Sequence, residues 1–277
     1  MSVHPLAEPF VSDGDATSPH GRVGVLLSHG FTGSPASMKP WAEYLAQHGY
    51  AVSLPRLPGH GTTWQEMNKT TWADWYGELE RAFEALSNQV DTVVVCGLSM
   101  GGALALRLAA DHPDRVAGLV LCATAARFSP DDDRRAGSVL AGAMATSLRL
   151  APPEVRRRMA QSAIGVLSRE TSMSPAFIDE TSRHDPAAIV EASRAVMAFD
   201  ASSWVGQLGC PALSIVTERD RLVPRARQVD LAHALGAPII PLPADHDVAV
   251  TRPALFLPAL TLACRDVAGR ATRRAVS

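Results

Sequence analysis

The chain has 277 residues, of which 47% are hydrophobic and 19% are charged, and its formal net charge at pH 7 is −2. This composition is typical of a folded globular protein and argues against extended disorder. A net charge so close to zero provides no global field for a polyanion, so we expect no nucleic-acid partner and favour a small-molecule partner.

Residues 1–20 are expected to form an N-terminal extension. They contain Pro5, Pro9 and several acidic residues, and they lack the apolar stretch of about 7–15 residues that an export signal needs. No apolar run in the chain approaches the roughly 18–20 residues that cross a bilayer. We therefore expect a soluble, cytoplasmic protein without stable membrane insertion, and the sequence leaves a homodimer open.

Further along the chain, short apolar runs bounded by Gly, Pro or Asp alternate with longer segments of helical periodicity. The predicted strands are Gly24–Ser28, Ala51–Leu54, Thr92–Cys96, Val116–Leu121, Leu213–Thr217 and Pro238–Leu242. The predicted helices are Ala36–His48, Ala73–Asn88, Met100–Asp111, Arg225–Leu235 and Pro253–Cys264. This order predicts an α/β protein with a mostly parallel central sheet flanked by helices.

The alternation is interrupted between residues 124 and 203, where no strand pattern occurs and Ala, Arg, Ser and Met recur at helical spacing. We expect a helical cap inserted into one core domain that is made of residues 21–123 and 204–264. The basic run Arg156–Arg158 could bind an anionic group, although charge clusters on helices are usually solvated faces. Residues 265–277 are expected to form a frayed, basic tail.

Two smaller features have structural explanations. Thr71, followed three residues later by Asp74, resembles a capping box at the start of the second predicted helix. The chain has four cysteines in separate apolar contexts with no CxxC pair, and we expect free, buried thiols at Cys96, Cys122, Cys210 and Cys264.

The pentapeptide from Gly97 to Gly101 has the pattern G-x-S-x-G and stands between a predicted strand and a predicted helix. A serine at so sharp a turn adopts strained dihedrals, and glycines two residues before and after it let the neighbouring backbone pass. The turn exposes the hydroxyl, so we predict that Ser99 is a nucleophile. The alternative is a glycine-rich helix start that packs on the sheet or binds phosphate, but neither a P-loop lysine nor G-x-G-x-x-G is present.

A nucleophilic serine of this kind needs donors for the oxyanion of the tetrahedral intermediate. The loop after the first predicted strand supplies one backbone N–H in this arrangement, and the residue after the nucleophile supplies the other. Phe31 and Met100 are therefore the candidate oxyanion donors. His29, in the same loop, is expected to brace it by hydrogen bonding rather than to transfer protons.

An alcohol is a poor nucleophile at neutral pH, so Ser99 also needs a base that a carboxylate orients. Asp220 follows a predicted strand and is the preferred candidate for the acid. Glu218 is the competing candidate, and its alternative role is a solvent-facing ion pair. His246, on a loop beyond the last predicted strand, is the candidate base, because His233 falls inside a helical pattern.

The following motifs occur in this order along the chain, with a late histidine after them: HGFTG, PRLPGHGT, TTWADW, GLSMGG and ERDRLVP. In this order they resemble the motifs of proteins with the α/β-hydrolase fold. Within that fold they are similar to the bacterial monoacylglycerol lipases and related carboxylesterases. The likeness is densest from Val23 to Leu121 and resumes from Gly209 to about Val250. Asp247 departs from the family pattern, in which Val usually follows the base, and the roles of Asp245 and Asp247 stay open.

The resemblance implies a serine esterase with the triad Ser99, Asp220 and His246 and the oxyanion donors Phe31 and Met100. It implies hydrolysis of monoacylglycerol or short-to-medium acyl esters through an acyl-enzyme, with no metal and no organic cofactor. A thioesterase or acyltransferase with the same triad is an alternative. A ligand-binding receptor that has the fold without turnover is another.

Overall fold

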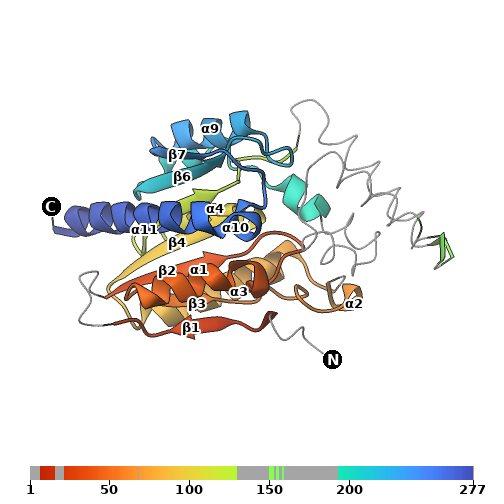
Figure 1. Ribbon diagram of the computed structural model, residues 1–277, viewed down its shortest axis with the longest axis horizontal. Helices are drawn as coiled ribbons and strands as arrows, with labels where there is room; N and C mark the ends of the chain where they lie inside the picture. The colour runs from red at the N-terminus through yellow and green to blue at the C-terminus, as the bar shows by residue number, and fades with distance from the viewer. Residues whose placement is uncertain are drawn as a thin grey trace.

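The computed structural model describes residues 7–15, 22–67, 69–129, 150–152, 154, 155, 158 and 193–276. The strands in these residues form one seven-stranded sheet with the order β1-β3-β2-β4-β5-β6-β7 (Figure 1). Neighbouring strands are parallel, except that β1 and β3 are antiparallel. The strands are β1 (Phe10–Ser12), β2 (Val23–Ser28), β3 (Ala51–Leu54), β4 (Thr92–Leu98), β5 (Val116–Cys122), β6 (Ala212–Thr217) and β7 (Ile239–Leu242).

Helices cover both faces of this sheet. One face carries α1 (Pro35–Gln47), α10 (Val248–Thr251) and α11 (Pro253–Val276), with α1 and α11 in front of the strands in Figure 1. The other face carries α3 (Trp72–Ser87), α4 (Met100–Asp111) and α9 (Arg225–Ala234). Two further short elements are α2 (Trp64–Met67) and the 3₁₀ helix η2 (Val205–Gln207).

Both faces of the strands are buried, and each face has its own apolar core. In β4, Val94 and Cys96 belong to the core beneath α1 and α11, whereas Val93 and Val95 belong to the core beneath α3 and α4. Successive side chains of a strand point to opposite faces, so a strand covered on both sides is apolar throughout. This is why the strands occur in the sequence as continuous apolar runs.

The predicted strands and helices are confirmed, and every boundary but one lies within two residues of its predicted position. The predicted capping box is confirmed as well: the Thr71 backbone N–H donates to Asp74 Oδ2 at 2.8 Å, and the Asp74 N–H donates to Thr71 Oγ1. The predicted free thiols are confirmed. Cys96, Cys122 and Cys264 are buried, while Cys210 is half-buried.

The prediction of a frayed tail after residue 264 is wrong. Helix α11 continues to Val276. The reason is a buried stripe in which Val267, Ala268 and Ala271 face the protein interior. Arg270 also donates from Nη2 to the backbone carbonyl of Ala212 at 2.8 Å, so the basic residues are part of a packed helix.

The expected N-terminal extension contains a strand that the sequence pattern did not reveal. Phe10–Ser12 forms β1 and pairs with the edge of the sheet, with Phe10 opposite Leu54. An edge strand of three residues, with only one side paired, is too short to show a periodic pattern. Within the described part of the chain, no helix has the length and apolar content that crossing a membrane requires.

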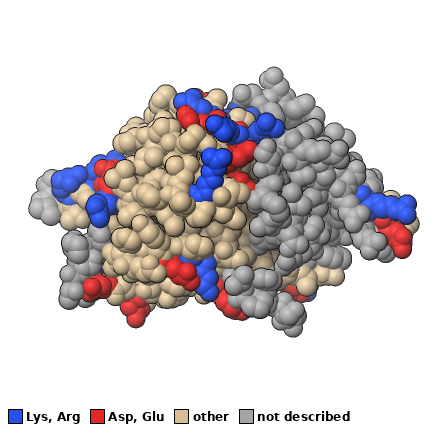
Figure 2. All heavy atoms as spheres, viewed as in Figure 1, with Lys and Arg blue, Asp and Glu red and all other residues tan. Residues whose placement is uncertain are grey.

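Most of the predicted cap, residues 124–203, lies outside the described residues, and so do Arg156 and Arg157 of its basic run. The two ends of this segment lie side by side. Arg127 and Asp200 form an antiparallel bridge, and the Ala201 N–H donates to the Ala126 carbonyl at 2.8 Å. On the face shown in Figure 2, acidic and basic side chains are interspersed, in keeping with the small net charge.

Candidate active site

The candidate catalytic residues follow three parallel strands of the sheet. β4, β6 and β7 end at Leu98, Thr217 and Leu242, and Ser99, Asp220 and His246 come after them. The carboxyl ends of parallel strands meet at one edge of a sheet, where the ligands of open α/β sheets bind. The topology therefore brings residues that are far apart in sequence to the same edge.

Ser99 occupies the sharp turn between β4 and α4. Its φ is 54° and its ψ is −119°, a conformation that residues with a side chain rarely adopt and that stores strain. Two contacts, one from the last residue of β5 and one from the segment after it, hold it there: the Ser99 N–H donates to the Cys122 carbonyl at 2.9 Å, and Thr124 Oγ1 donates to the Ser99 carbonyl at 2.8 Å. The backbone at this turn is thus fixed independently of any ligand.

The glycines on either side of Ser99 are required by close backbone contacts. A Cβ on Gly97 would overlap the backbone of Gly101 and Gly102, and a Cβ on Gly101 would overlap the carbonyl of Ser28. The prediction that both positions need a residue without a side chain is confirmed.

Asp220 and His246 are joined directly. His246 Nδ1 lies 2.8 Å from Asp220 Oδ2, and the Asp220 side chain is fully buried while 12% of the His246 side chain is exposed. A carboxylate only accepts, so Nδ1 carries the proton and Nε2 is left as an acceptor. Glu218 and His233, the alternative residues, are exposed at the surface.

Ser99 is not joined to this pair by a hydrogen bond, because its Oγ has no hydrogen-bond partner among the described residues. In enzymes without substrate, the hydrogen bond between nucleophile and base is often long and tightens only when substrate binds. The structure therefore positions Asp220 and His246 as a pair and Ser99 as a separate, strained group at the same sheet edge.

The loop after β2 lies against the Ser99 turn. A Cβ on Gly30 would stand 3.5 Å from Ser99 Cβ. Phe31 is the residue after Gly30, so its backbone also lies near Ser99. Met100 is the first residue of α4, and the first backbone N–H groups of a helix have no partner within it. The Phe31 N–H, too, donates to none of the residues that the structure describes. Two candidate oxyanion donors are thus available beside Ser99.

His29 braces this loop, as predicted. Its Nδ1 lies 3.0 Å from the Gly30 carbonyl, and its Nε2 accepts from the Leu57 N–H at 3.2 Å. Complete burial, opposed in part by the hydrogen bond to the Gly30 carbonyl and aided by the nearby positive charge of Arg56, lowers the pKa of His29 to about 4. The imidazole is therefore neutral at physiological pH, with the proton on Nδ1, and it ties the loop after β2 to the segment after β3.

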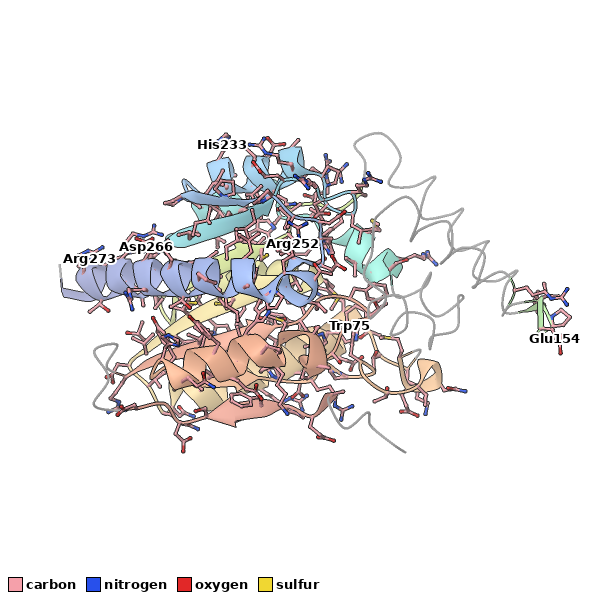
Figure 3. All side chains as sticks on the ribbon, in the orientation of Figure 1. Trp75, Glu154, His233, Arg252, Asp266 and Arg273 are labelled. Atoms are coloured by element: carbon pink, nitrogen blue, oxygen red, sulfur yellow. The ribbon has the colours of Figure 1, made fainter. Side chains whose placement is uncertain are left out.

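The side chain of Phe31 packs into an aromatic cluster. Its ring lies 6.2 Å from the ring of Trp75 and 6.3 Å from that of His60, and His60 and Trp75 are 5.3 Å apart (Figure 3 labels Trp75). His60 closes a turn, as its sequence context predicts: its N–H donates to the Leu57 carbonyl at 3.1 Å. These contacts hold the side chain of Phe31 while leaving its backbone N–H free to donate.

The two acids beside His246 shape its turn. Asp245 Oδ1 accepts from the backbone N–H of His246 at 2.9 Å. Asp247 is the N-cap of α10, and its carbonyl accepts from the Val250 N–H at 2.9 Å. The structure therefore gives both aspartates a part in shaping the turn. Among the described residues, no His, Cys, Asp and Glu side chains are grouped so as to hold a metal ion.

Sequence reasoning missed the residues that hold the acid and the nucleophile in place. Asp220 Oδ2 accepts from Thr217 Oγ1 at 2.8 Å and from Gln228 Nε2 at 3.1 Å, and Thr124 holds the Ser99 carbonyl. The sequence contains one signal for Thr217, a hydroxyl at the end of a buried strand just before the acid. Gln228 lies in a predicted helix and carries no motif.

Comparison with known proteins places these motifs in a recognised group. The family described as Hydrolase_4, serine aminopeptidase S33, matches residues 19–241, so the match ends before His246. The thermostable monoacylglycerol lipase of Bacillus sp. (strain H-257) is 50% identical over 114 residues, which are 41% of this chain and 43% of that lipase. The carboxylesterase of Bacillus subtilis (strain 168) is 35% identical over 105 residues, 37% of this chain and 42% of that enzyme.

These alignments span less than half the length of either relative. A solved structure, from work on the metagenome-derived lipolytic enzymes LipS and LipT, covers 96% of this chain and 100% of its own. It has a TM-score of 0.68 and 28% sequence identity with this chain. The similarity therefore extends over almost the whole chain and beyond the end of the family match at residue 241.

Proposed function

Since the chain belongs to the Hydrolase_4 family, serine aminopeptidase S33, and has the α/β-hydrolase fold, we propose that it hydrolyses carboxylic esters through an acyl-enzyme formed on Ser99. The observation that carries the proposal is the placement of a strained serine turn and a buried Asp220–His246 hydrogen bond at the same edge of the sheet. Strain of this kind is characteristic of functional sites, because only a well-determined surrounding structure maintains it.

In the proposed reaction, Ser99 Oγ attacks the ester carbonyl and His246 Nε2 takes the hydroxyl proton. Asp220 holds the Nδ1–H side of the imidazole, which fixes the tautomer and stabilises the imidazolium. The backbone N–H groups of Phe31 and Met100 receive the negative charge on the carbonyl oxygen.

The intermediate then collapses. The proton on His246 Nε2 passes to the alkoxide, the alcohol leaves, and the acyl group stays on Ser99. Water attacks this acyl-enzyme, gives its proton to His246, and the acid is released with the proton returned to Ser99. Each bond that forms in the first half is broken in the second, so the protein is regenerated.

The proposed substrates are monoacylglycerols and short-to-medium acyl esters. Two relatives support this choice, one named as a monoacylglycerol lipase and the other as a carboxylesterase. The solved structure from work on lipolytic enzymes supports it as well. The family description mentions an aminopeptidase. Rates on amide substrates should therefore be measured beside rates on esters.

The test uses a fluorophosphonate probe together with p-nitrophenyl butyrate. The wild-type protein should be labelled and should hydrolyse the ester, and Ser99→Ala should lose both while remaining folded. Removal of a catalytic nucleophile typically lowers kcat by about 10⁶-fold. Unchanged turnover in Ser99→Ala would refute the assignment of the nucleophile.

Rates on matched acyl-CoA, ester and p-nitroanilide substrates separate the alternatives. A preference for the thioester would identify a thioesterase, and transfer of the acyl group to an added alcohol in preference to water would identify an acyltransferase. Binding of an ester without any product over hours would identify a receptor.

A further inference from the structure

We propose that Gln228 on α9 is a positioning residue for the acid–base pair, acting on Asp220 through the hydroxyl of Thr217. The inference rests on the proposed function, since it concerns how that site holds its acid. Gln228 is 2% exposed, and its amide contacts both the last residue of β6 and the loop after β6 that carries Asp220.

Two backbone groups fix the orientation of the Gln228 amide. The Thr217 backbone N–H can only donate, and it lies 3.0 Å from Gln228 Oε1. The Val223 carbonyl can only accept, and it lies 2.7 Å from Gln228 Nε2. The oxygen must therefore face Thr217 N–H and the nitrogen must face the Val223 carbonyl. This leaves the second Nε2 proton for the polar groups beside it.

That second proton points to Thr217 and Asp220. Gln228 Nε2 lies 2.8 Å from Thr217 Oγ1 and 3.1 Å from Asp220 Oδ2. The single hydroxyl proton of Thr217 has Asp220 Oδ2 at 2.8 Å and Gln228 Oε1 at 3.2 Å as acceptors. The shorter contact is to a carboxylate, and hydrogen bonds to charged groups are the stronger ones. Gln228 thus donates to Thr217, and Thr217 donates to Asp220.

The remaining contacts show what this chain of donors achieves. Asp220 Oδ1 accepts from the backbone N–H groups of Leu222, at 2.9 Å, and Val223, at 2.8 Å. With Thr217 donating to Oδ2 and Gln228 holding the Thr217 hydroxyl, both carboxylate oxygens are fixed before His246 is considered. The plane of the carboxylate cannot rotate, so Oδ2 stays directed at His246 Nδ1. A misplacement of about 1 Å in such a group can cost about 100-fold in rate.

The residue at position 228 must therefore be an amide and not merely a polar group of similar size. In Gln228→Glu, an oxygen that only accepts would face the Val223 carbonyl and Asp220 Oδ2, and a second charge would be buried. In Gln228→Met, the shape is nearly retained but every hydrogen bond is lost. In Thr217→Val the hydroxyl alone is lost, whereas Thr217→Ser keeps it.

The experiment measures steady-state hydrolysis of p-nitrophenyl butyrate by Thr217→Val, Thr217→Ser, Gln228→Met and the double variant Thr217→Val/Gln228→Met. His233→Gln is the matched control, since His233 is exposed on the same helix and points outward in Figure 3. Thr217→Val and Gln228→Met should each lower kcat by roughly 10- to 100-fold with KM little changed, as expected for loss of a hydrogen bond to a charged group. Thr217→Ser should recover most of the wild-type kcat, and the double variant should fall no further than the worse single variant, because both residues act on one oxygen.

A second readout does not depend on turnover. The proton on His246 Nδ1, held by a carboxylate, gives a far-downfield proton NMR resonance, which can be recorded without ester and also in Ser99→Ala. Thr217→Val should shift or broaden this resonance, and Thr217→Ser and His233→Gln should not. If the wild type shows the resonance and its dependence on Thr217 but hydrolyses no ester, the proposed function fails and the inference stands.

The inference is overturned if folded Thr217→Val keeps both the wild-type kcat and the wild-type resonance. It is also overturned if the effects of the two substitutions on kcat multiply, since independent action would exclude a chain of donors. If Gln228→Met does not fold, comparison of Thr217→Val with Thr217→Ser can still support or overturn the inference.

Discussion

Gly101 of the nucleophile turn lies directly against Ser28, the last residue of β2. A Cβ on Gly101 would overlap the Ser28 carbonyl and would stand 2.7 Å from the carbonyl oxygen of His29. Both obstacles are backbone, so neither can move without shifting β2 or the loop that follows it. We predict that Gly101→Ala lowers the free energy of unfolding by about 4 kcal/mol or more, or prevents folding.

Gly77 provides the opposite case in the same protein. It lies inside α3, where a Cβ would meet no atom within 4 Å. Gly77→Ala should therefore raise the free energy of unfolding by roughly 0.5–1 kcal/mol, because alanine loses less backbone entropy in a helix. Urea unfolding of Gly101→Ala and Gly77→Ala measures both changes in the free energy of unfolding. Equal effects at the two positions would contradict the account of close approach.

The contrast shows why so much of this fold can be predicted from the sequence. Strands buried on both faces leave continuous apolar runs, and a strand-to-helix turn that another strand crosses closely needs glycine at defined positions. The edge strand β1 and the last turns of α11 could not be predicted. Both depend on which neighbouring surface they meet, and a sequence does not state that directly.

Asp220→Asn should lower kcat by on the order of 10³- to 10⁴-fold with little change in KM. An amide at this position presents N–H groups toward His246 Nδ1 and favours the wrong tautomer of the imidazole. Glu218→Gln is the control, because Glu218 is exposed and should keep wild-type turnover. Steady-state kinetics on p-nitrophenyl butyrate provide the measurement. A larger loss in Glu218→Gln than in Asp220→Asn would reverse the assignment of the acid.

The candidate catalytic residues could be predicted from the sequence, but the residues that hold them in place could not. Ser99, Asp220 and His246 follow strand ends that the apolar pattern locates, so their meeting at one sheet edge follows from the topology. Gln228 and Thr124 act through contacts that form only when separate segments of the chain pack in three dimensions. An isolated Gln inside a helical pattern has no periodic or motif signal, so no sequence rule distinguishes it from its neighbours.

Thr71→Ala tests the capping box at the start of α3. It removes the Oγ1 acceptor of the Asp74 N–H, and we expect a loss of about 1 kcal/mol in the free energy of unfolding. Ser34→Ala is the matched comparison, since Ser34 is the N-cap of α1 and its side chain caps no backbone N–H. That change should stay within about 0.5 kcal/mol. Thermal or urea unfolding that ranks Ser34→Ala as the more damaging change would show that the cap is not the relevant contact.

The buried His29 makes stability depend on pH. Its pKa in the folded protein is about 4, against 6.5 for an ordinary histidine, because burial penalises the charged imidazolium. Between these values the unfolded chain binds more protons at this residue than the folded protein does. The free energy of unfolding contributed by His29 is therefore complete above about pH 6.5 and is lost as pH falls, by roughly 3 kcal/mol at pH 4.

Other groups titrate in the same window, so the prediction concerns a difference between two proteins. His29→Asn does not titrate and retains a side-chain donor near the Gly30 carbonyl, although it leaves the Leu57 N–H without its acceptor. The variant should be less stable than wild type at pH 7 by about 1–3 kcal/mol, and the gap should narrow or reverse toward pH 4. His48→Asn, at an exposed histidine, should leave the pH dependence as it is in wild type. Urea unfolding at intervals from pH 7 to pH 4 measures all three proteins, and parallel curves for wild type and His29→Asn would mean that His29 is not the neutral brace of the loop after β2.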